Sequence, residues 1–208
     1  MWCIVGCDPD VGGALAVITG HDVGCANTVR IFNCPTQTVM VNRRPRERIC
    51  VDGMVALLRG LDLPARTVAQ LEVGGGQSAY NAQTCFAQGA ASGTWHGVLV
   101  SHDLDVRLVA ASTWKWALNL ARRGAPRDKN DSRDLAKKLF ATPNNDVAAL
   151  LRRQKDHGRA EALLLAAHGH WADGNRDVLA TRLNCLITMT DLQRLGQAPI
   201  EEAPIVID

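Results

Sequence analysis

No hydrophobic run in the sequence approaches the roughly 20 residues that a membrane-spanning helix needs, so no membrane contact is expected. None of the seven cysteines belongs to a CxxC pair, and most lie in apolar segments, which argues against a disulfide framework and against a zinc site. No internal repeat is visible, and because a strand is expected from Trp2 onwards, we expect no signal or transit peptide within this sequence. We therefore expect reduced thiols in a reducing compartment.

The chain as a whole has almost no net charge, but its segments differ strongly in charge. The formal net charge of the 208 residues is only +2. Residues 1–106 contain 7 Lys and Arg against 9 Asp and Glu, residues 107–159 contain 13 against 5, and residues 160–208 contain 3 against 7. The middle segment thus carries +8, which indicates either a polyanion-binding surface or a solvated helical face.

The apolar pattern predicts one α/β domain over residues 1–195 and an acidic, proline-containing tail at 196–208 that we expect to be flexible. A meander and a β-α-β crossover together make a mixed five-stranded sheet with helices on both faces. The expected strands cover residues 2–7, 14–19, 25–34, 67–73 and 95–101. A polar loop is expected at 35–48. The expected helices cover residues 49–61, 78–91, 111–120, 130–140 and 144–174, the last with a break near 156–158.

Carboxylates stand at the ends of buried elements. Asp8 ends the first strand, and Glu72 ends the strand at 67–73. If these two strands are neighbours, both acids lie at one edge of the sheet. Asp156 and Glu161 stand at the start of an otherwise apolar helix. Taken singly, each acid has an ordinary explanation as a turn former, a solvated strand end or a partner of the helix dipole.

Together, the four acids have a chemical meaning. Like charges this close repel one another unless a cation joins them. Mg²⁺ prefers carboxylate oxygens and keeps positions open for water and phosphate. Two such ions roughly 3.5 to 4 Å apart can activate a water molecule and stabilise the leaving oxygen of a phosphodiester. Four acids beside a basic segment therefore suit hydrolysis of a nucleic acid backbone.

Four segments, in consistent order from about Trp2 to Trp171, resemble the RuvC-like Holliday junction resolvases of the ribonuclease H superfamily. They are "GCDPDVGGALAVI", "LEVGGGQSAYNAQTCFAQG", "VAASTWKWALNL" with "DKNDSRDLAKKLF", and "KDHGRAEALLLAAHGHW". The second and fourth look most like the chloroplast branch of the family, the monokaryotic-chloroplast resolvases of plants and green algae. The resemblance implies a ribonuclease H-like mixed five-stranded sheet.

The same resemblance implies a function. It is that of a Mg²⁺-dependent endodeoxyribonuclease, with two ions per site and Mn²⁺ as a substitute, that cuts four-way junction DNA without a nucleotide cofactor. Such an enzyme would support DNA recombination and nucleoid segregation in the chloroplast stroma. Two symmetric cuts require two active sites, so a two-fold homodimer is expected, with the helices near 78–91 and 112–121 as candidate interfaces.

Site residues follow from the resemblance position by position. It implies Asp8, Glu72, Asp156 and Glu161 as catalytic metal ligands and Lys129 as a catalytic lysine near the scissile phosphate. Asp156 and Glu161 are five residues apart, roughly 140° around an ideal helix, whereas RuvC-like helices commonly carry two acids three apart. If Asp156 lies just before the first turn of the helix, its carboxylate could still meet those of Asp8, Glu72 and Glu161. His157 shares the face of Glu161, and it could replace Asp156 as a ligand, lie behind the ligands or merely begin the helix.

Contacts with DNA are expected from the glycine-rich segment after Glu72 and from the basic segment. Flexible glycines let the backbone approach DNA, and guanidinium groups grip phosphates. Helix capping by Ser78 and plain helix solubility are the alternatives. The candidates are Gln77, Ser78, Asn81, Lys115, Arg122, Arg123, Arg127, Lys129 and Arg133.

Two other functions stay open at this stage. "DPDVGG" also resembles the phosphate-binding hairpin of actin-like and sugar-kinase-type phosphotransferases, although a chain of 208 residues is not expected to hold their second domain. A non-catalytic junction-binding protein of the same fold is the other alternative.

Overall fold

The computed structural model describes residues 2–20, 28–41, 43–74, 81–120, 129–141 and 146–172. Five strands form one sheet in the order β3-β2-β1-β6-β7. They are β1 (Trp2–Asp8), β2 (Ala14–Gly20), β3 (Thr28–Asn33), β6 (Val68–Val73) and β7 (Asp105–Ala110). β2 is antiparallel to β1 and β3, whereas β1, β6 and β7 are parallel. The predicted α/β fold class, a mixed five-stranded sheet made of an antiparallel meander and parallel strands, is confirmed.

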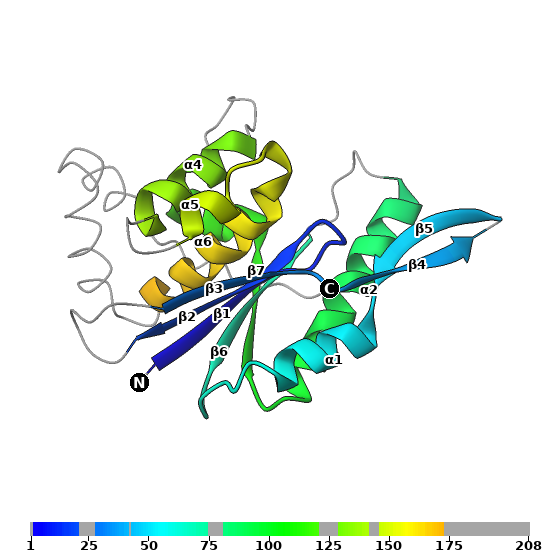
Figure 1. Ribbon diagram of the computed structural model, residues 1–208, viewed down its shortest axis with the longest axis horizontal. Helices are drawn as coiled ribbons and strands as arrows, with labels where there is room; N and C mark the ends of the chain where they lie inside the picture. Colours follow the sequence, from blue (N-terminus) through cyan, green and yellow to red (C-terminus); the bar gives the residue numbers. More distant parts are fainter. Residues whose placement is uncertain are drawn as a thin grey trace, which may run out of the picture.

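Helices cover both faces of this sheet (Figure 1). One face carries α1 (Val51–Arg59) and α2 (Ala82–Val100). The other carries α3 (Ala111–Ala117), α4 (Lys129–Phe140), α5 (Val147–Leu150) and α6 (His157–Ala172), with a short 3-10 turn η1 (Gln154–Asp156) before α6. The predicted break near 156–158 is thus close to the start of α6. None of the helices in the described ranges is long and apolar enough to cross a membrane.

Each strand divides its side chains between two cores, as the two-residue repeat of a strand requires. In β1, Val5 and Cys7 belong to the core under α1 and α2, whereas Ile4 belongs to the core under α6. Gly6 also faces α6, and a Cβ atom there would overlap the main-chain carbonyl of Ala162. The absent side chain lets α6 lie directly on β1.

The prediction of a polar loop at 35–48 is wrong. These residues form a hairpin of β4 (Thr36–Val41) and β5 (Arg44–Ile49), a two-stranded sheet separate from the main one. Both of its faces carry polar or exposed side chains, so no alternation of apolar and polar residues marks the strands. Cross-strand pairing without a buried face leaves little trace in a sequence.

The prediction of a strand at 95–101 is also wrong. These residues continue α2, and the fifth strand of the sheet is β7. Ala91, Trp95, Val98 and Leu99 are buried, at the spacing of one helix face. The β-branched and aromatic residues of this stretch favour a strand locally, but packing against the sheet keeps the helix. The predicted parallel crossover itself is confirmed, with α2 joining β6 to β7.

Candidate active site

Asp8 and Glu72 come together because β1 and β6 are parallel neighbours. Cys7 lies opposite Leu71 in the ladder, so Asp8 and Glu72 occupy the next position on each strand. Cys7 and Leu71 face α1 and α2, so Asp8 and Glu72 point to the opposite side of the sheet, towards α6, at its carboxyl edge. After β1 the chain turns tightly, with the Gly13 amide donating to the Asp10 carbonyl over 2.8 Å.

Helix α6 brings the third carboxylate. A Cβ atom at Gly158 would overlap the Gly12 carbonyl and lie 3.1 Å from Asp8 Oδ2, so only glycine lets the first turn of α6 meet the turn after β1. Glu161 lies almost one turn further along and acts electrostatically on both Asp8 and Glu72. The structure thus gathers Asp8, Glu72 and Glu161, which the sequence places in three separate elements.

Asp8, Glu72 and Glu161, which we call the carboxylate cluster, are like charges held close together. Burial raises the pKa of Asp8 well above its usual value, and the charges of Glu72, Glu161 and Asp10 raise it further. Burial also raises the pKa of Glu72, although Lys115 and a hydrogen bond from Trp114 partly offset that effect. Folding therefore holds these two carboxyl groups in a place where negative charge is unfavourable until a cation joins them.

Helix α3 supplies two side chains that bind the carboxylates of Glu72 and Glu161. The indole Nε1 of Trp114 donates to Glu72 Oε2 over 2.8 Å, and Lys115 Nζ lies 3.0 Å from Glu161 Oε1. Lys115 Nζ also lies 4.8 Å from the centroid of the Trp114 ring. From α4, the Ser132 hydroxyl donates to Glu161 Oε1 over 3.3 Å. Lys115 thus lies beside the carboxylate cluster, and its contact with DNA stays a prediction.

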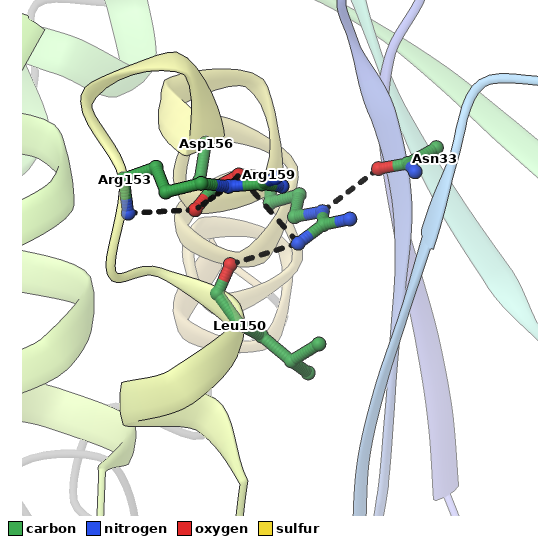
Figure 2. Close-up of polar contacts among 5 residues, drawn as sticks. All are labelled: Asn33, Leu150, Arg153, Asp156 and Arg159. Atoms are coloured by element: carbon green, nitrogen blue, oxygen red, sulfur yellow. Dashed lines mark hydrogen bonds and ion pairs between the residues drawn. The ribbon is translucent and has the colours of Figure 1, made fainter.

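Asp156 has different partners from the other acids. Its carboxylate is 4% exposed and accepts hydrogen bonds from the backbone and guanidinium of Arg153, at 2.8 and 2.9 Å, while Arg159 lies 3.6 Å away. Although burial raises the pKa of Asp156, the hydrogen bonds and charges of these arginines outweigh it and lower that pKa overall. Arg159 in turn donates to the Leu150 carbonyl and to Asn33 at the end of β3, as Figure 2 shows. In this structure Asp156 ties η1 to α6.

The remaining predicted residues are placed as follows. His157 is half-buried and begins α6. Asn81 caps α2 by accepting a 2.8 Å hydrogen bond from the Thr84 amide, and Arg133 donates to Asn130 within α4. Lys129 opens α4, but its side chain lies outside the described residues. Also outside them lie Gln77, Ser78, Arg122, Arg123 and Arg127.

Three further residues near the cluster were not predicted from the sequence. Asp10 adds negative charge from the turn after β1, Trp114 binds Glu72, and Ser132 binds Glu161. The position of Asp10 in "DPD", two residues after Asp8, was a usable signal. The sequence contains no signal for Trp114 or Ser132, because their contacts depend on how α3 and α4 pack on the sheet.

The donor set suits a hard divalent ion, but Glu72 Oε2 and Glu161 Oε1 are already bound by other side chains. Carboxylate oxygens are the ligands that Mg²⁺ prefers. Within the described ranges, however, no three or more His, Cys, Asp or Glu side chains are arranged to hold a metal ion. Lys115 and Trp114 bind the oxygens of Glu161 and Glu72 instead. An ion that binds through Glu161 Oε1 would compete with Lys115 for that oxygen.

Comparison with protein-family models and with curated proteins finds no match. Among solved structures, RuvC from Thermus thermophilus is similar to this chain with a TM-score of 0.48 and 14% sequence identity, over 83% of this chain and 96% of that one. A structure of T. thermophilus RuvC in complex with a Holliday junction substrate is similar with a TM-score of 0.46 and 14% identity, over the same shares of the two chains.

Proposed function

We propose that this protein is a divalent-metal-dependent, structure-selective DNA endonuclease that resolves four-way junctions. The observation that carries the proposal is the convergence of Asp8, Glu72 and Glu161 from β1, β6 and α6 at one edge of the sheet. Buried like charges without a bound cation raise the free energy of the folded protein, so a site of this kind is explained by what it binds. The four sequence segments that resemble RuvC-like resolvases support the same function.

The chain's own residues have distinct tasks in this proposal. Asp8, Glu72 and Glu161 would hold Mg²⁺, which supplies an activated water and charge stabilisation for the leaving oxygen of the phosphodiester. Trp114 orients Glu72 through its 2.8 Å hydrogen bond. Lys115 neutralises Glu161 and, once released from it, provides an ammonium group for the scissile phosphate. Three other site residues remain predictions from the sequence: Lys129, Asp156 and His157.

We further propose a homodimer that pairs through α2. This helix of 19 residues contains no Lys, Arg, Asp or Glu, although half of it is exposed. Phe86 is 77% exposed, and beyond it Gly89, Gly93 and Gly97 leave open space along the same face. Small residues let two helices approach closely, and an uncharged exposed face is typical of an interface. Gly93→Arg should therefore shift the mass measured by light scattering from dimer to monomer, whereas Gly60→Arg at the end of α1 should not.

A junction-cleavage assay tests the function. The purified protein is incubated with a labelled four-way junction and with linear duplex of the same sequence, in Mg²⁺, Mn²⁺ or EDTA. We expect paired symmetric cuts in the junction alone and only with metal. Asp8→Asn and Glu72→Gln should abolish cutting while junction affinity survives, and Asp134→Asn, an exposed acid on α4, should cut normally.

The outcomes separate the candidates. Equal cutting of junction and duplex would refute the resolvase proposal. Normal cutting by either cluster variant would refute the metal site. Binding without cutting under every metal would favour the non-catalytic junction-binding protein. The Lys115–Glu161 ion pair favours this alternative, because Lys115 occupies one carboxylate oxygen of the cluster. The chloroplast location is proposed from the resemblance alone, and imaging of the tagged gene product in plastids tests it.

A further inference from the structure

Asp156 holds the guanidinium group of Arg153 in one position. Its Oδ1 accepts hydrogen bonds from Nη2 and Nε of Arg153 at 2.9 and 3.2 Å, and its Oδ2 accepts one from the Arg153 amide at 2.8 Å. The backbone bond alone would be enough to cap the short turn η1. The bonds to the side chain are additional, and they fix a group that would otherwise change rotamer freely on the protein surface.

The fixed side chain of Arg153 is nevertheless open to solvent. It is 51% exposed, whereas the side chain of Asp156 is 3% exposed. A guanidinium group has five N–H donors, and Asp156 binds only those of Nε and Nη2. In the parts of the chain that the structure describes, Nη1 of Arg153 forms no hydrogen bond. The outer donors of an ordered cation are therefore available to an anion.

The charges around Asp156 leave this position positive. Arg159 Nη1 lies 3.6 Å from Asp156 Oδ1, so two guanidinium groups face one carboxylate (Figure 2). With histidine neutral, residues 152–159 contain four Lys or Arg and one Asp, a net charge of +3. Two of these cations, Arg152 and Lys155, are exposed and form no ion pair within the described ranges. A buried acid thus orders this segment without cancelling its charge.

The segment lies beside the carboxylate cluster. Gly158, two residues after Asp156, meets the turn after β1, where a Cβ atom on it would lie 3.1 Å from Asp8 Oδ2. The turn η1 also packs against α4. From Arg153 to Gly158 the chain rises by roughly 8 to 10 Å, at about 1.5 to 2 Å per residue. On a DNA strand this distance corresponds to about three nucleotides, at roughly 3.4 Å each.

We propose that Arg153 binds a backbone phosphate of the DNA strand close to the scissile phosphate, and that Asp156 is the positioning residue that holds its guanidinium group ready. A guanidinium fork matches phosphate oxygens, and an ordered fork loses less conformational entropy on binding than a free side chain does. The inference rests on the proposed function for the presence of DNA, but it concerns binding and not the chemistry. It gives Asp156 a different task from the metal ligand that the sequence predicts.

Arg153→Gln tests the phosphate contact. Affinity for a four-way junction is measured by fluorescence anisotropy in EDTA over a range of salt concentrations. We expect binding about fivefold weaker than that of wild type at 100 mM salt, and a slope of log affinity against log salt that is shallower by about 0.9, the value for one lost phosphate contact. Arg153→Lys should keep the slope and still bind more weakly than wild type, because an ammonium group lacks the fork. The matched control Arg59→Gln, an exposed arginine at the end of α1, should bind like wild type.

Asp156→Asn separates positioning from charge. The change makes the protein more positive by one charge, so a purely electrostatic effect would tighten junction binding. Loss of the hold on Arg153 predicts the opposite, binding about twofold to threefold weaker in EDTA. Arg153→Gln/Asp156→Asn should bind no more weakly than Arg153→Gln alone, since Asp156 acts through Arg153. The matched control Asp134→Asn, which removes an exposed acid from α4, should not weaken binding.

The rise in Tm on addition of metal reports on the other role of Asp156. Mg²⁺ or Mn²⁺ should raise the Tm of Asp156→Asn by as much as that of wild type. A smaller rise would overturn the inference, because Asp156 would then bind the ion. Unchanged affinity and salt slope in Arg153→Gln, whose side chain is half exposed in wild type, would overturn it as well. Since binding is measured without metal, weaker binding by Arg153→Gln in a protein that never cuts would refute the proposed nuclease and uphold the phosphate contact.

Discussion

Replacing Asp8 by Asn should make the metal-free protein more stable while it abolishes metal-dependent cutting. Asp8 is surrounded by the charges of Glu72, Glu161 and Asp10, and its pKa is raised first by burial and then by those charges. Asn keeps the shape and an acceptor oxygen but carries no charge. The folded protein therefore loses a repulsion that the unfolded chain hardly feels.

The size of the effect follows from the sheet. Neighbouring strands lie about 5 Å apart, and two unit charges at that distance repel by roughly 3 kcal/mol at an effective dielectric constant of 20. Lys115 and partial solvent contact reduce this, so we expect a gain of about 1 to 2 kcal/mol in the free energy of unfolding. For a chain of this size that gain corresponds to a rise in Tm of roughly 2 to 8 °C.

The effect should depend on pH in one direction. A carboxyl group whose pKa is raised by folding contributes stability that is complete below its unfolded pKa of about 3.9 and is lost as pH rises through the folded value. The Tm of Asp8→Asn should therefore match wild type near pH 4 and exceed it progressively towards pH 8. The measurement is thermal unfolding in EDTA at each pH, with Asp134→Asn as the control for loss of an exposed charge.

Mg²⁺ should reverse the order of the two proteins. At a hundred times its Kd a bound ion adds about 2.7 kcal/mol to wild type, which exceeds the advantage of about 1 to 2 kcal/mol that Asp8→Asn has without metal, whereas the variant itself should gain little from the ion. If Asp8→Asn lowers Tm in EDTA at pH 8 by more than Asp134→Asn does, the repulsion described here is absent. If both proteins respond equally to Mg²⁺, Asp8 does not bind the ion.

Three further predictions concern other parts of the protein. Asp156→Asn should lower the free energy of unfolding by about 2 kcal/mol at pH 7, because it removes the buried negative charge that accepts hydrogen bonds from Arg153 and lies beside Arg159, and hydrogen bonds to a charged group are worth roughly 1.5 to 3 kcal/mol. This loss should shrink as pH falls through the lowered pKa of the wild-type carboxyl, as urea unfolding at pH 7 and pH 3 would show. Gly6→Ala should destabilise by several kcal/mol, since its methyl group would overlap the backbone of α6, whereas Gly93→Ala, which meets open space in a helix, should stabilise the monomer by up to about 1 kcal/mol. Burial raises the pKa of Cys34 to about 11, so iodoacetamide at pH 8 should alkylate Cys34 far more slowly than the partly exposed Cys85, as peptide mass spectrometry can measure.

Much of the site could be predicted because it depends on backbone periodicity. A strand that ends in Asp8 and a parallel strand that ends in Glu72 must present both acids at one edge once they are neighbours. Chain order and a crossover made that pairing the expected one. Glu161 could be predicted because it is an acid in the first turns of a helix whose residues from Ala160 to Ala167 are otherwise apolar and buried.

The rest of the site could not be predicted, because it depends on how side chains from distant elements pack together. Asp156 and Glu161 looked like a pair, but η1 turns the chain so that Asp156 meets Arg153 and not the cluster. The ion pair between Lys115 and Glu161 exists because α3 packs beside α6, a long-range contact with no local signature. The hairpin was missed for the opposite reason, since it buries too little to leave a pattern.

Helix α6 is fastened to the sheet at three heights along its axis. Gly158 touches the turn after β1, the backbone near Ala162 lies against Gly6, and Gly169 rests on the side chain of Gln70. The contacts at Gly158 and Gly6 are with main-chain atoms, and the contact at Gly169 is with the buried Gln70 side chain. Helix α6 therefore cannot rotate or slide by a fraction of a turn without a steric clash. The direction of Glu161 is thus set by the backbone, and side-chain changes around it can alter charge or access without re-aiming the carboxylate.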